Sequence, residues 1–141
     1  QLVSFTKEKA TNHLAKILNI NAAATIISMK RVLTFNSKPL ILDVIKIPAA
    51  SFRGLTADRV VEKKGSMYRM YETDFGIRML HADEKIRAVV ANYEAASLLG
   101  VKEHSPLLSV ERVSYTYDDQ PIEWRLGLCI TDNHYYRAEL D

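Results

Sequence analysis

Two stretches of the chain, 81 residues apart, share one pattern and decide the fold: Ile26-Ile27-Ser28-Met29-Lys30-Arg31-Val32 with Lys38-Pro39-Leu40, and Leu107-Leu108-Ser109-Val110-Glu111-Arg112-Val113 with Gln120-Pro121-Ile122. Each copy reads as a strand, a turn and a second strand, with one extra residue in the second turn. The residues upstream also match, since Ala15, Leu18 and Ile20 recur as Ala96, Leu99 and Val101. A long period that occurs only twice predicts one domain with two related halves, and excludes a solenoid.

Composition agrees with a single domain. The chain has 141 residues, of which 48% are apolar and 26% are charged, enough to bury one sizeable core. The formal net charge is +2, and no basic run is longer than two residues, as in Lys63-Lys64. Scattered charge of this kind is typical of a solvated surface and not of a nucleic-acid binding face.

Cysteine usage and hydropathy indicate the compartment. Cys129 is the only cysteine, so an internal disulfide is excluded and a reducing compartment is favoured. No run of 18 apolar residues exists, and residues 1–5 do not resemble a signal peptide. We therefore expect a soluble, cytoplasmic protein. The chain begins without methionine, from which we expect that residues upstream have been removed.

Residue spacing predicts strands and helices that alternate without βαβ spacing. The resulting prediction is an α+β fold with a mostly antiparallel sheet. In the first half we expect a strand over 2–5, a helix over 7–18 capped by Thr6, and strands over 25–35 and 40–47 joined by a turn at 36–39. In the second half we expect a helix over 57–61, a helix from Ser66 to Gly76, a strand over 77–81, a helix from Asp83 to Gly100, a hairpin of 107–117 and 122–130, and a last strand over 135–140.

Two charged residues interrupt the apolar faces of the first predicted hairpin. Alternation places Arg31 between Met29 and Leu33, and it places Asp43 among isoleucines on the returning strand. Burying either charge alone is costly, so each needs a partner. Two interpretations stay open: an Arg31–Asp43 ion pair, or a ligand cavity whose floor carries fixed charge. The repeat supplies a second arginine, Arg112, at the equivalent position.

The last long strand has one apolar and one polar face. Ile122, Trp124 and Leu126 alternate with Glu123 and Arg125. On alternation alone, the face of Glu123 and Arg125 is expected to point into solvent.

Motifs of common catalytic and metal sites are missing from the sequence. The four histidines are dispersed, the five glycines are isolated, and no Gly-x-Ser-x-Gly elbow occurs. Asp118-Asp119 is explained by turn formation. Cys129 is expected to be a packed or cavity-lining thiol. We therefore predict no metal, no cofactor and no enzymatic activity.

An ordered set of short segments resembles a known family. The set comprises Gly65-Ser66-Met67-Tyr68, Gly76-Ile77, Ile86-Arg87-Ala88, Leu99-Gly100-Val101, Glu111-Arg112-Val113 and Gln120-Pro121-Ile122-Glu123. Together these segments resemble the UTRA domain, the effector-binding domain of GntR-family transcription regulators of the HutC subfamily, over essentially residues 1–141. The resemblance implies a chorismate lyase-like fold, a homodimer, and an upstream winged helix-turn-helix that binds operator DNA.

The resemblance also implies a pocket for a small-molecule effector. The predicted effector-binding residues of this chain are Arg31, Asp43, Ser66, Met67, Glu123 and Cys129. Leu33 stands where the family often has a second arginine, and Cys129 where it commonly has a tyrosine. The predicted effectors are therefore sugars, amino acid derivatives and organic acids as well as sugar phosphates.

Two functions from different classes follow. The first is the ligand-sensing and dimerisation domain of a transcription regulator, expected to be a repressor, whose effector changes operator affinity. The alternative is a chorismate lyase-like enzyme acting on a small aromatic acid. The segments quoted above favour the regulator, whereas a shared fold favours neither function.

Overall fold

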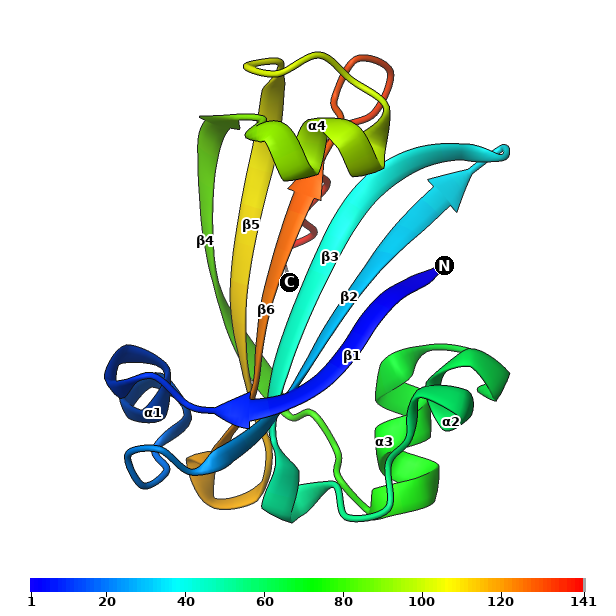
Figure 1. Cartoon of the computed structure of the whole chain (residues 1–141). Helices are drawn as coiled ribbons and strands as arrows, with labels where there is room; N and C mark the ends of the chain where they lie inside the picture. Colours follow the sequence, from blue (N-terminus) through cyan, green and yellow to red (C-terminus); the bar gives the residue numbers. More distant parts are fainter. Residues whose placement is uncertain (141) are drawn as a thin grey trace.

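A computed structural model describes residues 1–140 of the chain. Its centre is a six-stranded sheet in which every neighbouring pair is antiparallel, in the order β1-β2-β3-β6-β5-β4 (Figure 1). The strands are Leu2–Lys9 (β1), Thr25–Phe35 (β2), Lys38–Pro48 (β3), His81–Val90 (β4), Pro106–Tyr115 (β5) and Pro121–Cys129 (β6). The helices are Asn12–Leu18 (α1), Ala57–Glu62 (α2), Met67–Phe75 (α3) and Tyr93–Leu99 (α4), and short 3-10 segments cover Ala49–Ser51 and Tyr117–Asp119.

The strand order confirms the two related halves. Each half has the order strand, helix, strand, strand: β1-α1-β2-β3 is followed by β4-α4-β5-β6. The halves join where β3 pairs with β6, and Val44 faces Leu126 at the centre of that pair. Asp43 faces Gly127 on one side of this point, and Ile45 faces Arg125 on the other. A pseudo-two-fold axis therefore passes between Val44 and Leu126.

Helices pack on both faces of the sheet. One face carries α1, which packs on Ile26, and α4, which packs on Leu42 and Leu107. The other face carries α2 and α3, which pack on β2 and β3 residues such as Met29 and Ile45. Figure 1 shows α1 and α4 at opposite ends of the sheet, and α2 and α3 together at one end. No helix within residues 1–140 has both the length and the apolar character needed to cross a membrane.

The first predicted hairpin and helix α3 are confirmed, but the predicted turn over 36–39 is too long. Lys38 and Pro39 already pair with Phe35 and Thr34, so Asn36-Ser37 alone join the two strands. Both turn residues have positive φ (51° and 65°), as in a type I′ turn. Helix α3 begins after Ser66, whose hydroxyl accepts a hydrogen bond from the Arg69 amide. It ends at Gly76, where a left-handed φ of 66° favours glycine.

The helix predicted over 7–18 is wrong in its first half. Strand β1 continues to Lys9, because its backbone pairs with β2 as far as Thr25. Helix α1 then begins at Asn12, and Thr11, not Thr6, is its cap. The Thr11 side chain accepts a hydrogen bond from the amide of Leu14.

The helix predicted from Asp83 to Gly100 is also wrong, because it merges a strand with a shorter helix. Residues His81–Val90 form the edge strand β4, which pairs with β5 along its whole length. Helix α4 starts only after Asn92, whose side chain accepts from the Ala95 amide. The strand predicted over 77–81 is correspondingly misplaced.

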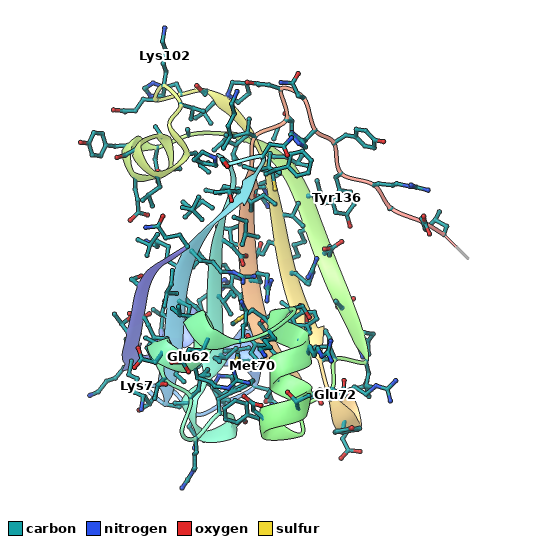
Figure 2. All side chains as sticks on the ribbon, turned by 90° about the vertical axis from the view of Figure 1, so that its right-hand side faces the viewer. Lys7, Glu62, Met70, Glu72, Lys102 and Tyr136 are labelled. Atoms are coloured by element: carbon teal, nitrogen blue, oxygen red, sulfur yellow. The ribbon has the colours of Figure 1, made fainter. Side chains whose placement is uncertain are left out.

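The C-terminal segment has no strand where one was predicted, over 135–140. It runs as an irregular chain beside β4, and Figure 2 shows the Tyr136 side chain extending from it. The Tyr136 hydroxyl donates to Glu84 of β4. His134 packs edge-to-face on Phe35 at the end of β2.

Candidate functional site

Charged residues gather on the sheet face that carries α2 and α3. Strand register sets them in rows that run across the sheet. One row contains Arg31, Asp43 and Gly127, and the next row towards α3 contains Arg125 and Arg112. The prediction that β6 turns this face to solvent is therefore wrong, because helices cover both sides of the sheet and not only the apolar side of β6.

Glu123 is the most deeply buried carboxylate of the site, with no exposed surface. Tyr68 and Tyr71 of α3 each donate a hydroxyl hydrogen bond to it, at 2.8 Å. The Arg125 guanidinium binds both carboxylate oxygens, at 2.9 and 3.2 Å. One cation and two neutral donors thus offset the desolvation cost of burying the Glu123 carboxylate. The same contacts hold α3 against the sheet.

Asp43 joins this network to the first hairpin. Its Oδ2 accepts a hydrogen bond from Arg31 Nε at 2.8 Å and lies 3.5 Å from the terminal nitrogen Nη1 of Arg125. The predicted Arg31–Asp43 pair is therefore confirmed. Because two cations share one carboxylate, the pair is also part of a larger charged cluster.

Arg112 extends the cluster towards the other edge of the sheet. Its Nε donates to Glu84 of β4 at 2.9 Å, and its Nη1 donates to the Tyr68 hydroxyl at 3.2 Å. Tyr68 in turn lies 3.0 Å from the Ser114 hydroxyl. Through Glu84, the hydrogen bonds continue to Tyr136 of the C-terminal segment. One network thus connects α3, the five strands β2 to β6 and the C-terminal segment.

Proton affinities in the network reflect burial beside fixed charges. Burial and the Glu123 charge raise the pKa of Tyr71 well above its ordinary value, so this hydroxyl stays a donor. Burial disfavours the charged form of Arg125, but Glu123 and Asp43 outweigh it and raise the pKa of the guanidinium. Arg125 therefore stays charged across the physiological pH range.

Cys129 lies beyond the charged rows, on the same face. It pairs with Ile41 and Leu108, and these three residues form part of the wall of a cavity of about 180 Å³. The C-terminal segment covers this cavity with His134 and Tyr136. Burial, with a contribution from Asp43, raises the pKa of the Cys129 thiol, so the residue is a poor nucleophile at neutral pH.

The predicted site residues do not all meet. Arg31, Asp43 and Glu123 belong to one network, and Cys129 lies on the same face outside it. The Ser66 hydroxyl is occupied as the cap of α3. Met67 is buried in the core below α3. Within residues 1–140, no three His, Cys, Asp or Glu side chains are grouped as a metal site requires.

Sequence reasoning missed several members of the network. Arg125 and Glu84 were not among the predicted site residues, nor were Tyr68 and Tyr71. The repeat contained a signal for Arg125, because matching the two prolines aligns it with Asp43. The tyrosines gave no comparable signal, since both are compatible with a helix packed on a core.

Comparison with known proteins identifies the family. A family model for the UTRA domain matches residues 1–135. This chain belongs to the UTRA domain family. Its fold is very similar to a crystal structure from Bordetella bronchiseptica, described as the ligand-binding domain of a GntR-family transcriptional regulator, with 40% identity and a TM-score of 0.97. The match covers 100% of this chain and 89% of that one.

Curated relatives of this UTRA domain are longer proteins. The transcriptional repressor PhnF of Mycolicibacterium smegmatis is 28% identical over 97% of this chain, which spans 55% of that protein. The regulator YurK of Bacillus subtilis is 24% identical over 87% of this chain, which spans 50% of it. The UTRA domain thus spans about half the length of these relatives. They favour a ligand-sensing regulatory domain over the lyase alternative.

Proposed function

We propose that this UTRA domain senses a small metabolite for a GntR-type transcription regulator that binds operator DNA through a winged helix-turn-helix upstream of Gln1. The curated relatives support this proposal, since they are transcription regulators about twice as long as this chain. The HutC subfamily, a repressor role and a cytoplasmic location belong to the same proposal.

The observation that carries the proposal is the position of Arg31. Its Nε is bound to Asp43, yet the side chain keeps 14% of its surface exposed at the edge of a buried network. A guanidinium held by one carboxylate offers its remaining donors in a fixed orientation, which suits recognition of an anionic or polar ligand. An effector that binds Arg31 therefore acts directly on the Asp43 and Arg125 ion pairs.

The network suggests how binding is transmitted. Asp43 contacts Arg125, which holds Glu123, and Glu123 accepts hydrogen bonds from two tyrosines of α3. A ligand that draws Arg31 away from Asp43 changes this balance and favours a different position of α3 on the sheet. Such differential binding to two states is what couples an effector site to a distant DNA-binding domain.

We further propose that the domain forms a homodimer. Both edge strands, β1 and β4, have an unpaired backbone edge within residues 1–140. Ile86 and Val90 of β4 are 47% and 60% exposed. Exposed apolar residues along a free strand edge favour association with another copy of the chain.

The experiment that tests the proposed function uses the full-length protein and DNA from its own promoter region. The expected result is that the protein binds this DNA and that a metabolite from a defined collection changes the affinity. The same metabolite should no longer change the DNA affinity of the Arg31→Ala protein. DNA binding that no metabolite alters, or that responds equally in both proteins, would contradict the proposal.

A further inference from the structure

The floor of the candidate site changes from charged to apolar along the strands. The row that contains Arg125 and Arg112 is charged, the next contains Arg31, Asp43 and Gly127, and the third contains Leu33, Ile41, Cys129 and Leu108. Consecutive rows on one face are two residues apart, or about 7 Å. A ligand of modest length therefore reaches from a guanidinium to an entirely uncharged surface.

A cavity lies over the apolar row. Its volume is about 180 Å³, and its walls are mainly Leu40, Ile41, Leu108, Cys129 and Ile130, under the side chains of His134, Tyr135 and Tyr136. An apolar cavity of roughly 150 Å³ is large enough to bind a benzene molecule. A sugar hydroxyl that faces the aliphatic side chains would lose its hydrogen bonds to water, and only Thr131, His134 and the two tyrosines could replace them, which disfavours a sugar here.

Gly127 lies beside this cavity, in the row of Arg31 and Asp43. It lies between Asp43 and Val110 in the middle row, and its lack of a side chain leaves the floor low at that point. A methyl group built there would contact Ile41 at 3.7 Å and the Cys129 sulfur at 3.9 Å. The position thus tolerates alanine, but only by narrowing the path between the two parts of the site.

The charge of the site favours a ligand with one negative charge. The site contains three carboxylates, which belong to Asp43, Glu84 and Glu123. Their charge is balanced by three guanidinium groups, which belong to Arg31, Arg112 and Arg125. Lys63 adds one cation: burial, and then the nearby charge of Arg31, lower its pKa. Within residues 1–140, Arg31 forms its hydrogen bond through Nε, so both terminal nitrogens remain available to a carboxylate.

We propose that the effector is a small apolar monocarboxylic acid, whose carboxylate binds Arg31 and whose hydrocarbon group, about the size of one six-membered ring, occupies the cavity beneath the C-terminal segment. This inference rests on the proposed function and specifies its ligand class. It assigns Cys129 and Leu108 to the wall that selects the hydrocarbon group.

The test measures calorimetric binding of phenylacetate, 3-phenylpropionate and cyclohexanecarboxylate to the chain, with phenylacetamide and glucose 6-phosphate as comparison ligands. At least one of the acids should bind, and the uncharged amide should bind about tenfold more weakly or not at all. In the Cys129→Phe variant, which fills the cavity, the affinity for that acid should fall by about tenfold or more. Ser97→Phe, which adds the same ring at an exposed position of α4 on the opposite face of the sheet, is the matched control and should retain the affinity.

Folding of each variant is checked by its thermal unfolding transition, and Leu108→Phe replaces Cys129→Phe if the latter does not fold. Failure of all three acids to bind at millimolar concentration would overturn the ligand class, as would equal binding to the filled variant. Binding of glucose 6-phosphate through Arg31 would also overturn it, while leaving the proposed sensing function intact. The sensing function is tested separately, and it is contradicted if no metabolite changes promoter binding by the full-length protein.

Discussion

Asp43 and Arg125 occupy equivalent positions in the two halves of the sheet, yet they carry opposite charges. Oδ2 of Asp43 lies 3.5 Å from Nη1 of Arg125 across the pseudo-two-fold axis. In a strictly symmetric domain, like residues would face each other here. Divergence of the two halves has instead produced an ion pair at the centre of the sheet. Arg31 and Glu123, which bind the two partners, extend this pair into the candidate site.

Removing the Arg125 guanidinium should strongly destabilise the fold. Arg125→Ala leaves Glu123 buried with two hydroxyl donors but no cation, and breaking a buried pair in this way costs about 3–5 kcal/mol. Urea unfolding followed by circular dichroism measures the difference. Arg137→Ala is the matched control, because the Arg137 side chain is 72% exposed, and it should change stability by less than about 0.5 kcal/mol. Equal effects of the two substitutions would show that Glu123 does not depend on Arg125.

The turn of the first hairpin offers a stabilising substitution. Ser37 has a φ of 65°, which is unfavourable for a residue with a side chain, whereas Asn-Gly is the preferred pair in a type I′ turn. Ser37→Gly should therefore raise the free energy of unfolding by about 1 kcal/mol. In contrast, Ser97→Gly within α4 should lower it by about 0.5 kcal/mol. A loss of stability on Ser37→Gly would mean that this turn is not type I′.

Reactivity of the single thiol should respond to pH. Burial, and to a smaller extent Asp43, raise the pKa of Cys129, so the neutral thiol persists to a higher pH than in an exposed cysteine. The rate of iodoacetamide alkylation should therefore rise at a higher pH in the folded chain than in the same chain unfolded in urea. Asp43→Asn removes the negative charge and should shift the folded profile towards lower pH. Coincident folded and unfolded profiles would place Cys129 outside the buried wall.

The isolated domain should be a homodimer that does not bind duplex DNA, since its charge is scattered and β4 presents an open, partly apolar edge. Analytical ultracentrifugation at micromolar concentration tests the first part. Ile86→Glu should shift the equilibrium towards monomer, because it introduces a charge on the exposed edge strand β4. A wild-type monomer at this concentration, or tight DNA binding by this chain alone, would refute the corresponding part.

The sequence was most informative where symmetry or turn chemistry constrained it. The pattern that recurs after 81 residues predicted the two hairpins, and Ser66 and Gly76 marked the two ends of α3. Strand β4 escaped because Ile86, Val89 and Val90 mimic a helical face, while an exposed edge strand lacks regular alternation of apolar and polar residues. The repeat could have corrected this error, because its offset of 81 residues aligns 83–90 with residues 2–9, which form β1.

The site was harder to predict than the fold. Arg31 and Asp43 stood out because they break an apolar face within one hairpin. Glu123 and Arg125 did not, because alternation on β6 distinguishes two faces but cannot show that helices cover both. Their partners Tyr68 and Tyr71 come from a helix more than 50 residues away in sequence, a distance across which local patterns carry no information.

The most direct measurement of the central claim is a thermal-shift screen of a defined metabolite collection on two proteins, wild type and Arg31→Ala. Ligand binding to the folded state raises its unfolding temperature, and at a fixed ligand concentration the rise grows with the logarithm of the affinity. The account predicts at least one metabolite that stabilises the wild type and fails to stabilise Arg31→Ala, although the variant is folded. If every stabilising metabolite binds both proteins within a factor of about two, below roughly 0.5 kcal/mol, the effector site does not include Arg31 and the account is contradicted.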